Sequence, residues 1–273
     1  GNQPTLEHFP ALVQALLLVK KAAVITNAES GFLPPPIGQA ILKSIDTLLS
    51  EEWGGYFPIH YLHGGGGTSA NMNVNEVLAN MAEEELGGRR GQYQMVHPND
   101  HVNLYQSTND IYPTACHIAI ILTWPSLNNT LKKLVQTFRQ HSRTYRKQVR
   151  IARTCLQDAV VISYRDYFDG IARMLNRQIR RLGAAIDALH EVNLGGTICG
   201  RSEDVPAAYF HGVIVNLRLV TSDSSYRQAK NLFDAAQNPD ALGAVSCTLV
   251  ILARSLLKVA QDLRLRRSGP RSG

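Results

Sequence analysis

Two short stretches of the chain concentrate side chains that could bind an anion. The first spans residues 64–76 and reads GGGGTSANMNVNE, and the second spans residues 97–110 and reads HPNDHVNLYQSTND. Glycine, hydroxyl and carboxamide groups dominate both, and each leads into an apolar run with helical spacing. Backbone and side-chain donors at helix N-termini favour anions. The two stretches together therefore predict a site for a small polyanion.

Simpler explanations exist for each stretch alone. The glycines could form a structural turn, because glycine permits backbone angles that other residues avoid. Residues 106–110 could serve simply as the N-terminal cap of a helix. A nucleotide site is disfavoured, since the run lacks Gly-Lys-Ser/Thr and follows no convincing buried strand. His97 and His101 have the spacing of a metal pair, but residues 98–100 between them are typical of a turn, and no thiolate or carboxylate completes a site. We expect no metal and no other cofactor.

Composition narrows the class of protein. The 273 residues are 44% hydrophobic, enough for one large domain or two ordinary ones. The formal charge of +6 is modest. The lysines and arginines of the chain are not clustered with aromatic residues, which argues against a nucleic-acid partner. The most apolar run, residues 243–260, contains Arg254 and Lys258, so no membrane span is expected. Reduced thiols and a cytoplasmic location are expected from four distant cysteines, which are Cys116, Cys155, Cys199 and Cys247.

The elements that must position these residues are mostly helices. Apolar spacing predicts two helices within residues 6–49, one at about 73–86, and long helices after residue 110, with Pro125 marking a kink or break. Two further helices are predicted at about 164–192 and 242–263. Residues 153–159 are typical of a polar turn, and residues 159–163 are the best candidate for a short strand.

This pattern predicts a mainly α fold, with a helical N-terminal domain in residues 1–110 and part of a long-helix bundle in residues 111–273. The last predicted helix has an apolar stripe and nothing after it to cover that stripe, so we expect an oligomer. The chain also starts without methionine and stops directly after a strong helix, and we expect it to be an excerpt of a longer protein.

Several segments, taken in order, resemble one family, the aspartase and class II fumarase branch of the fumarase/aspartase superfamily. The first stretch resembles its glycine-rich segment ending in Asn-Met-Asn-x-Asn-Glu-Val, and the second its Pro-Asn-Asp-His-Val-Asn and Gln-Ser-Thr-Asn-Asp segments. Residues 154–159 resemble its Thr-His-Leu-Gln-Asp-Ala turn. Further similarity covers residues 191–197, 231–233 and 262–265, so the resemblance extends over nearly the whole chain.

The resemblance implies a lyase that passes through a dianionic aci-carboxylate and expels ammonia or water to leave fumarate. A weak carbon acid requires many preorganised donors where the second negative charge develops. By resemblance, substrate carboxylate and amino groups would be held by Thr68, Ser107, Thr108 and Asn109, and the other carboxylate by Thr154. Cys155 stands at the position of a proton-handling histidine. A peripheral anion contact would involve His97, Asn99 and Asp100.

The resemblance favours aspartate ammonia-lyase over class II fumarate hydratase, because fumarases usually carry serine at the positions of Gly66 and Thr108. It also implies a homotetramer whose active sites each combine segments from three subunits. The serine base of the family lies on a loop that would begin shortly after Gly273, so this excerpt alone is expected to be inactive. A non-catalytic scaffold homologue is the other hypothesis, since Cys155, Arg201 and Arg267 depart from the family's usual residues.

Overall fold

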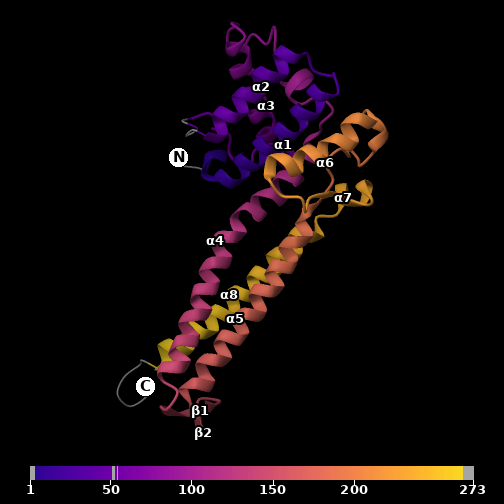
Figure 1. The fold of residues 1–273 in the computed structure, drawn as a ribbon. Helices are drawn as coiled ribbons and strands as arrows, with labels where there is room; N and C mark the ends of the chain where they lie inside the picture. Colours follow the sequence, from indigo (N-terminus) through magenta and orange to yellow (C-terminus); the bar gives the residue numbers. More distant parts are fainter. Residues whose placement is uncertain (1–3, 51–52, 54, 267–273) are drawn as a thin grey trace. The chain divides into compact units, whose positions relative to one another are not determined.

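A computed structural model describes residues 4–50, 53 and 55–266, so Arg267 lies outside the described residues. The described chain is mainly helical, which confirms the predicted fold class (Figure 1). Its internal contacts define two compact units, one formed by Gly1–Leu122 and Leu189–Pro239 and the other by Thr123–Ala188 and Asp240–Gly273. These are units of contact, and the division into domains at residue 110 stays a prediction.

Helix α1 (Pro10–Glu29) forms the centre of the first unit. It is apolar on nearly all faces, and every residue from Ala15 to Lys20 is buried. A helix that is apolar all round belongs in a core, and α1 packs against α2 (Pro35–Ser50) and α6 (Ala207–Thr221). The remaining elements of the unit include α3 (Thr68–Glu85), the start of α4 (Thr108–Thr144) and α7 (Leu232–Gln237).

The helices predicted in the N-terminal region are confirmed. Two helices occupy residues 6–49 as expected, and α2 starts at Pro35, where proline is favoured in the first helical turn. Helix α3 begins at Thr68, five residues before the predicted start at 73. The glycine-rich stretch therefore leads directly into a helix N-terminus.

The second unit contains the rest of α4 together with α5 (Tyr164–Asp187) and α8 (Asp240–Arg266), and α5 packs directly against α8. Helix α4 is not broken at Pro125. Proline removes one helical hydrogen bond, but the helix buries Ile118 before Pro125 and Leu131 after it, and this packing keeps both segments helical.

The predicted turn at residues 153–159 is in part a β-hairpin. Strands β1 (Val149–Thr154) and β2 (Gln157–Ser163) pair antiparallel, with Val149 opposite Ser163 and Thr154 opposite Gln157. The prediction of a strand at 159–163 was correct in kind but too short. Polar residues flank the turn. Because the side chains of the two strands are exposed or half-buried, the sequence shows no clear alternation of apolar and polar residues.

Helix α5 ends at Asp187, before the predicted end at 192, and the chain re-enters the first unit. A 3-10 turn at Ala188–His190 leads into β3 (Glu191–Val192), which pairs parallel with β4 (Arg227–Gln228). Residues 193–197 follow β3 directly. This short parallel pair places residues 193–197 in the first unit, which also contains the start of α4.

Two helices, α1 and α8, have the length and hydropathy of a membrane span, which differs from the sequence expectation. Helix α1 is mostly buried within the first unit, and core helices of globular domains share this composition. Helix α8 carries Arg254 and Lys258 within its apolar stretch. Length and composition alone therefore identify neither helix as a membrane span.

Candidate functional site

The glycine run forms a left-handed turn at the start of α3. All four glycines of residues 64–67 have positive φ, a region that glycine enters without a steric penalty. The hydroxyl of Thr68 donates to the Gly65 carbonyl at 2.9 Å. A Cβ atom on Gly67 would lie 2.3 Å from the ring of Tyr112 on α4. Only glycine at this position lets the start of α3 approach α4 so closely.

Residues 107–110 form an N-terminal cap for α4. The Ser107 backbone amide donates to Asp110 Oδ1 at 2.9 Å, and the Asn109 amide donates to Ser107 Oγ at 3.2 Å. Thr108 Oγ1 accepts from Asn71 Nδ2 on α3 at 3.1 Å. Residues 107–110 thus do cap a helix, as the simpler explanation predicted. The same contacts join the starts of α3 and α4, which brings the two polar stretches together.

Asp110 connects this cap to the loop after β3. Its carboxylate is buried, and Oδ2 accepts from the backbone amides of Gly195 at 3.0 Å and Thr197 at 3.3 Å. Burial raises the pKa of Asp110 to about 6, although these amides and Lys20 act in the opposite direction. Asn109 contributes a further link, since its Nδ2 donates to the Ile198 carbonyl at 2.9 Å. Two separate chain segments, the start of α3 and the loop after β3, are thereby bonded to residues 107–110.

Lys20 binds two residues of the second polar stretch. The sequence had not predicted Lys20 as part of the site. The side chain is fully buried on α1, and Nζ donates to Asn103 Oδ1 and Gln106 Oε1, both at 2.8 Å. Burial lowers the pKa of Lys20 to about 7, while the Asp110 carboxylate raises it. The available signal was the lysine pair Lys20–Lys21 within a strongly apolar helical run, because a buried lysine requires partners.

The peripheral residues His97, Asn99 and Asp100 form one helical turn. His97 Nδ1 accepts from the backbone amides of Asn99 and Asp100, each at 3.3 Å, and lies 3.2 Å from Asp100 Oδ2. His101 Nδ1 accepts from the His97 amide at 2.9 Å, and burial lowers the pKa of His101. Both histidines thus use a ring nitrogen to order the turn. Within the described residues, no cluster of three or more histidine, cysteine or acidic side chains is arranged to hold a metal ion.

Thr154 and Cys155 lie in the second unit, at the tip of the hairpin, and both are exposed. Cys155 and Leu156 form its two-residue turn, with φ values of 47° and 63°. This geometry normally selects asparagine or glycine, so two larger residues carry a conformational cost. Arg153 Nε binds Asp158 Oδ1 across the hairpin at 3.0 Å. The turn thus presents Thr154 and Cys155 to solvent at the end of a paired strand.

In the first unit, the polar residues form a supported set of donors. Thr68 and Asn109 are exposed and Ser107 and Thr108 are half-buried, whereas Asn71 and Asp110, which bind Thr108 and Ser107, are buried. They stand at the starts of two long helices, where backbone amides and the helix dipole favour negative charge. The Thr68 hydroxyl donates to Gly65, and the backbone amides of Ser107 and Asn109 donate within the cap. The arrangement is therefore suited to holding a carboxylate through the hydroxyls of Ser107 and Thr108 and the side-chain amide of Asn109.

Comparison with known proteins agrees with this geometry. Residues 4–273 match the model of a protein family described as lyase. The chain belongs to this lyase family. It is 39% identical to an aspartate ammonia-lyase from Bacillus sp., across 97% of this chain and 56% of the relative. It is also 40% identical to a class II fumarate hydratase from Nitrosomonas europaea, across 98% of this chain and 58% of the relative.

Solved structures give the same result. A crystal structure of fumarate lyase:delta crystallin from Brucella melitensis bound to cobalt superposes with a TM-score of 0.96 at 40% identity, covering 100% of this chain and 59% of the other. The structure of class II fumarase from Schistosoma mansoni gives a TM-score of 0.91 at 29% identity, covering 97% and 58%. These relatives confirm the predicted resemblance to the fumarase/aspartase superfamily. The chain spans somewhat more than half the length of the relatives it matches.

Proposed function

We propose that this chain is part of an aspartate ammonia-lyase, which converts L-aspartate reversibly to fumarate and ammonia. The reaction removes a proton beside an ionised carboxylate, so a second negative charge develops and must meet donors already in place. The observation that carries the proposal is the joining of two helix starts through Asn71 and Thr108, with Thr68, Ser107 and Asn109 accessible beside them.

In this proposal the residues of the first unit hold one end of the substrate. Thr68, Ser107, Thr108 and Asn109 bind the carboxylate and amino groups of aspartate. Thr154 binds the other carboxylate, and Cys155 takes the place of the family's histidine. We further propose a cytoplasmic homotetramer in which the hairpin tip of one subunit completes a site on another. His97, Asn99 and Asp100 form a peripheral contact for an anion.

Two positions favour ammonia release over hydration. In the motifs of the family, the hydratases usually carry serine at the two positions that Gly66 and Thr108 occupy in this chain. Gly66 has φ 62°, and a Cβ at this position would meet no other atom of the described structure within 4 Å. A serine would therefore meet no neighbouring atom and would place a hydroxyl at the turn, at a cost of about 1 kcal/mol in backbone strain. Class II fumarate hydratase is the second candidate, because relatives with that name are as similar as the ammonia-lyases.

The test uses the full-length product of the reading frame that contains these 273 residues. Fumarate formation is followed by its ultraviolet absorbance from L-aspartate and, separately, from L-malate. We expect activity with aspartate. Activity with malate alone would replace the proposal with the hydratase, and inactivity of a folded tetramer with both substrates would support the non-catalytic scaffold homologue.

A second set of measurements tests whether Gly66 and Thr108 determine the preference for aspartate over malate. Thr108→Ser keeps the hydroxyl that accepts from Asn71 and so should preserve folding. Combined with Gly66→Ser, it should lower kcat/KM for aspartate by about tenfold, which equals a loss of about 1.4 kcal/mol in transition-state stabilisation. Thr47→Ser on α2, whose hydroxyl donates to the Lys43 carbonyl, is the matched control and should leave both kinetic constants unchanged. An unaltered aspartate kcat/KM in the double variant would remove these two positions from the argument.

A further inference from the structure

The second unit contains a cationic cluster around Tyr167 at the start of α5. The guanidinium carbon of Arg266, near the end of α8, lies 3.4 Å from the centre of the tyrosine ring. The guanidinium carbon of Arg150, on β1, lies 5.6 Å from the same centre. Cation–π attraction accounts for the position of each guanidinium over the ring. It does not account for bringing two like charges to one ring.

Three polar atoms of this cluster are buried without a hydrogen-bond partner among the described residues: Tyr167 Oη, Arg150 Nη1 and Arg266 Nη1. Arg150 is otherwise engaged, since its Nε and Nη2 donate to the Ile151 carbonyl at 3.1 and 2.9 Å. A buried donor without an acceptor loses the hydrogen bonds that it makes to water. Three such atoms in one cluster therefore indicate a missing group that accepts hydrogen bonds.

The charges of the cluster also lack balance. Within the described chain, neither Arg150 nor Arg266 forms an ion pair, and the nearest acid in α8, Asp262, binds Lys258. Burial lowers the pKa of Arg266 and the Arg150 charge acts in the same direction, whereas Tyr167 and the Asp262 carboxylate act in the opposite direction. Burial also raises the pKa of Tyr167, so the phenol keeps its proton and can act as a donor. Two guanidinium groups face one nearby carboxylate that already binds Lys258, so the charges favour a missing group that is negative as well as an acceptor.

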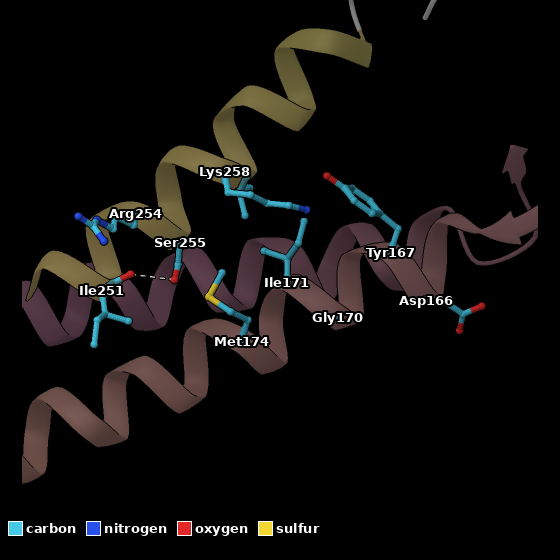
Figure 2. A pocket seen from close by; sticks show the side chains of 10 residues that line it. Asp166, Tyr167, Gly170, Ile171, Met174, Ile251, Arg254, Ser255 and Lys258 are labelled. Atoms are coloured by element: carbon cyan, nitrogen blue, oxygen red, sulfur yellow. Dashed lines mark hydrogen bonds between the residues drawn. The ribbon is translucent and has the colours of Figure 1, made fainter. Parts of the chain in front are cut away.

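A cavity in the same unit reaches one member of the cluster, Tyr167. A cavity of about 680 Å³ lies between α5 and α8, and Tyr167 forms part of its lining. Figure 2 shows the Lys258 side chain extending from α8 toward Tyr167, above an apolar floor that includes Ile171 and Met174. A small solute can thus reach Tyr167 without unfolding either helix.

We propose that Arg150, Tyr167 and Arg266 form a binding site for a small oxyanion, either inorganic phosphate or a carboxylate. Its oxygens accept from the two Nη1 atoms and from the phenol, and its charge offsets the unpaired guanidinium groups. Guanidinium groups are well matched to both ligands, because each presents several donors in one plane. This proposal does not depend on the lyase reaction proposed above.

Isothermal titration calorimetry of the full-length protein at constant ionic strength tests the site, with inorganic phosphate and with acetate in separate experiments. Acetate is used because a dicarboxylate would also bind the proposed aspartate site. We expect saturable binding of at least one, and the tighter ligand identifies the source of the oxyanion. Arg266→Leu should weaken that binding by about tenfold or more, as expected for loss of a charge-assisted hydrogen bond. Tyr167→Phe keeps the ring and should weaken it several-fold.

The matched control is Arg264→Leu, which removes an exposed arginine from the same end of α8. It changes the net charge as Arg266→Leu does and should leave binding unchanged. Circular dichroism confirms that each variant is helical. The proposal is overturned if neither anion shows saturable binding, or if Arg264→Leu and Arg266→Leu weaken binding equally, because attraction would then be nonspecific.

Discussion

Replacing Lys20 with methionine tests whether the buried ammonium holds the second polar stretch in place. Methionine has nearly the same length but no donor. In the native protein, Nζ donates to Asn103 Oδ1 and Gln106 Oε1 at 2.8 Å each. After the change, Asn103 Oδ1 keeps the amide of Asn71 at 3.4 Å, whereas Gln106 Oε1 loses the only donor recorded for it among the described residues. Lys20→Met therefore removes two hydrogen bonds and leaves one part-buried acceptor unpaired.

The expected cost is about 3 kcal/mol of unfolding free energy. A hydrogen bond contributes about 1 kcal/mol net, and an unsatisfied buried acceptor costs about 1–3 kcal/mol. The Asp110 carboxylate also loses a nearby positive charge, which adds to the cost. Relief of the burial penalty on the amine acts in the opposite direction and keeps the total below the sum of these terms.

The pH dependence identifies the group responsible. Burial lowers the pKa of Lys20 from 10.5 to about 7 in the folded protein. Between these values the unfolded chain binds a proton that the folded chain does not, so the contribution of Lys20 to stability rises with pH, by at most about 1.4 kcal/mol per unit. Below pH 7 both states are protonated and the contribution is constant. The stability difference between native protein and variant should therefore widen from pH 7 to pH 10.

Urea unfolding at several pH values, followed by circular dichroism, measures both effects. Lys21→Met is the matched control, because Lys21 is the next residue of α1 but binds Asp46 on the surface at 2.5 Å. Surface ion pairs contribute about 0–1 kcal/mol, so this control should change little. Parallel pH profiles for native protein and Lys20→Met, or equal losses in the two lysine variants, would refute the reasoning.

Two further predictions concern residues with positive φ. Gly67→Ala should destabilise the first unit by about 3 kcal/mol, because its Cβ would lie 2.3 Å from the Tyr112 ring at φ 100°; Gly87→Ala, at φ 87° with open space around it, should cost only the backbone strain of about 1 kcal/mol. Leu156→Gly should stabilise the hairpin by about 1 kcal/mol through relief of its left-handed conformation, whereas Val160→Gly within β2 should destabilise it. Thermal unfolding checks both pairs, and equal effects within a pair would contradict the respective explanation.

The sequence predicts the helices well because their apolar residues recur over many turns. The stripe of α8 and the two helices of residues 6–49 appear where expected. The hairpin was predicted only in part, since β1 and β2 have mostly exposed side chains and no buried face to impose strict alternation. The predicted break at Pro125 does not occur, because packing on both sides of it outweighs one missing hydrogen bond.

The candidate site divides in the same way. Local motifs identified Ser107, Thr108 and Asn109, since capping residues and hydroxyls next to one another can be read from the sequence. Their supports come from distant parts of the chain. Lys20 lies more than eighty residues before the cap, and Gly195 lies eighty-five residues after Asp110. Spacing along the sequence contains no information about such contacts, so the network that fixes the donors emerges only from the fold.

This network determines which way the Thr108 hydroxyl points. An ammonium has only donors, so Lys20 fixes the oxygens of Asn103 and Gln106 toward itself. Asn71 in turn directs its amide nitrogen to Asn103 Oδ1 and to Thr108 Oγ1. Because Thr108 accepts a hydrogen bond there, its own proton remains available to donate elsewhere. A buried cation on α1 therefore sets, through two carboxamides, the polarity of a half-buried hydroxyl at the start of α4. Donors fixed before an anion arrives need no reorganisation, and that is the property a site for developing negative charge requires.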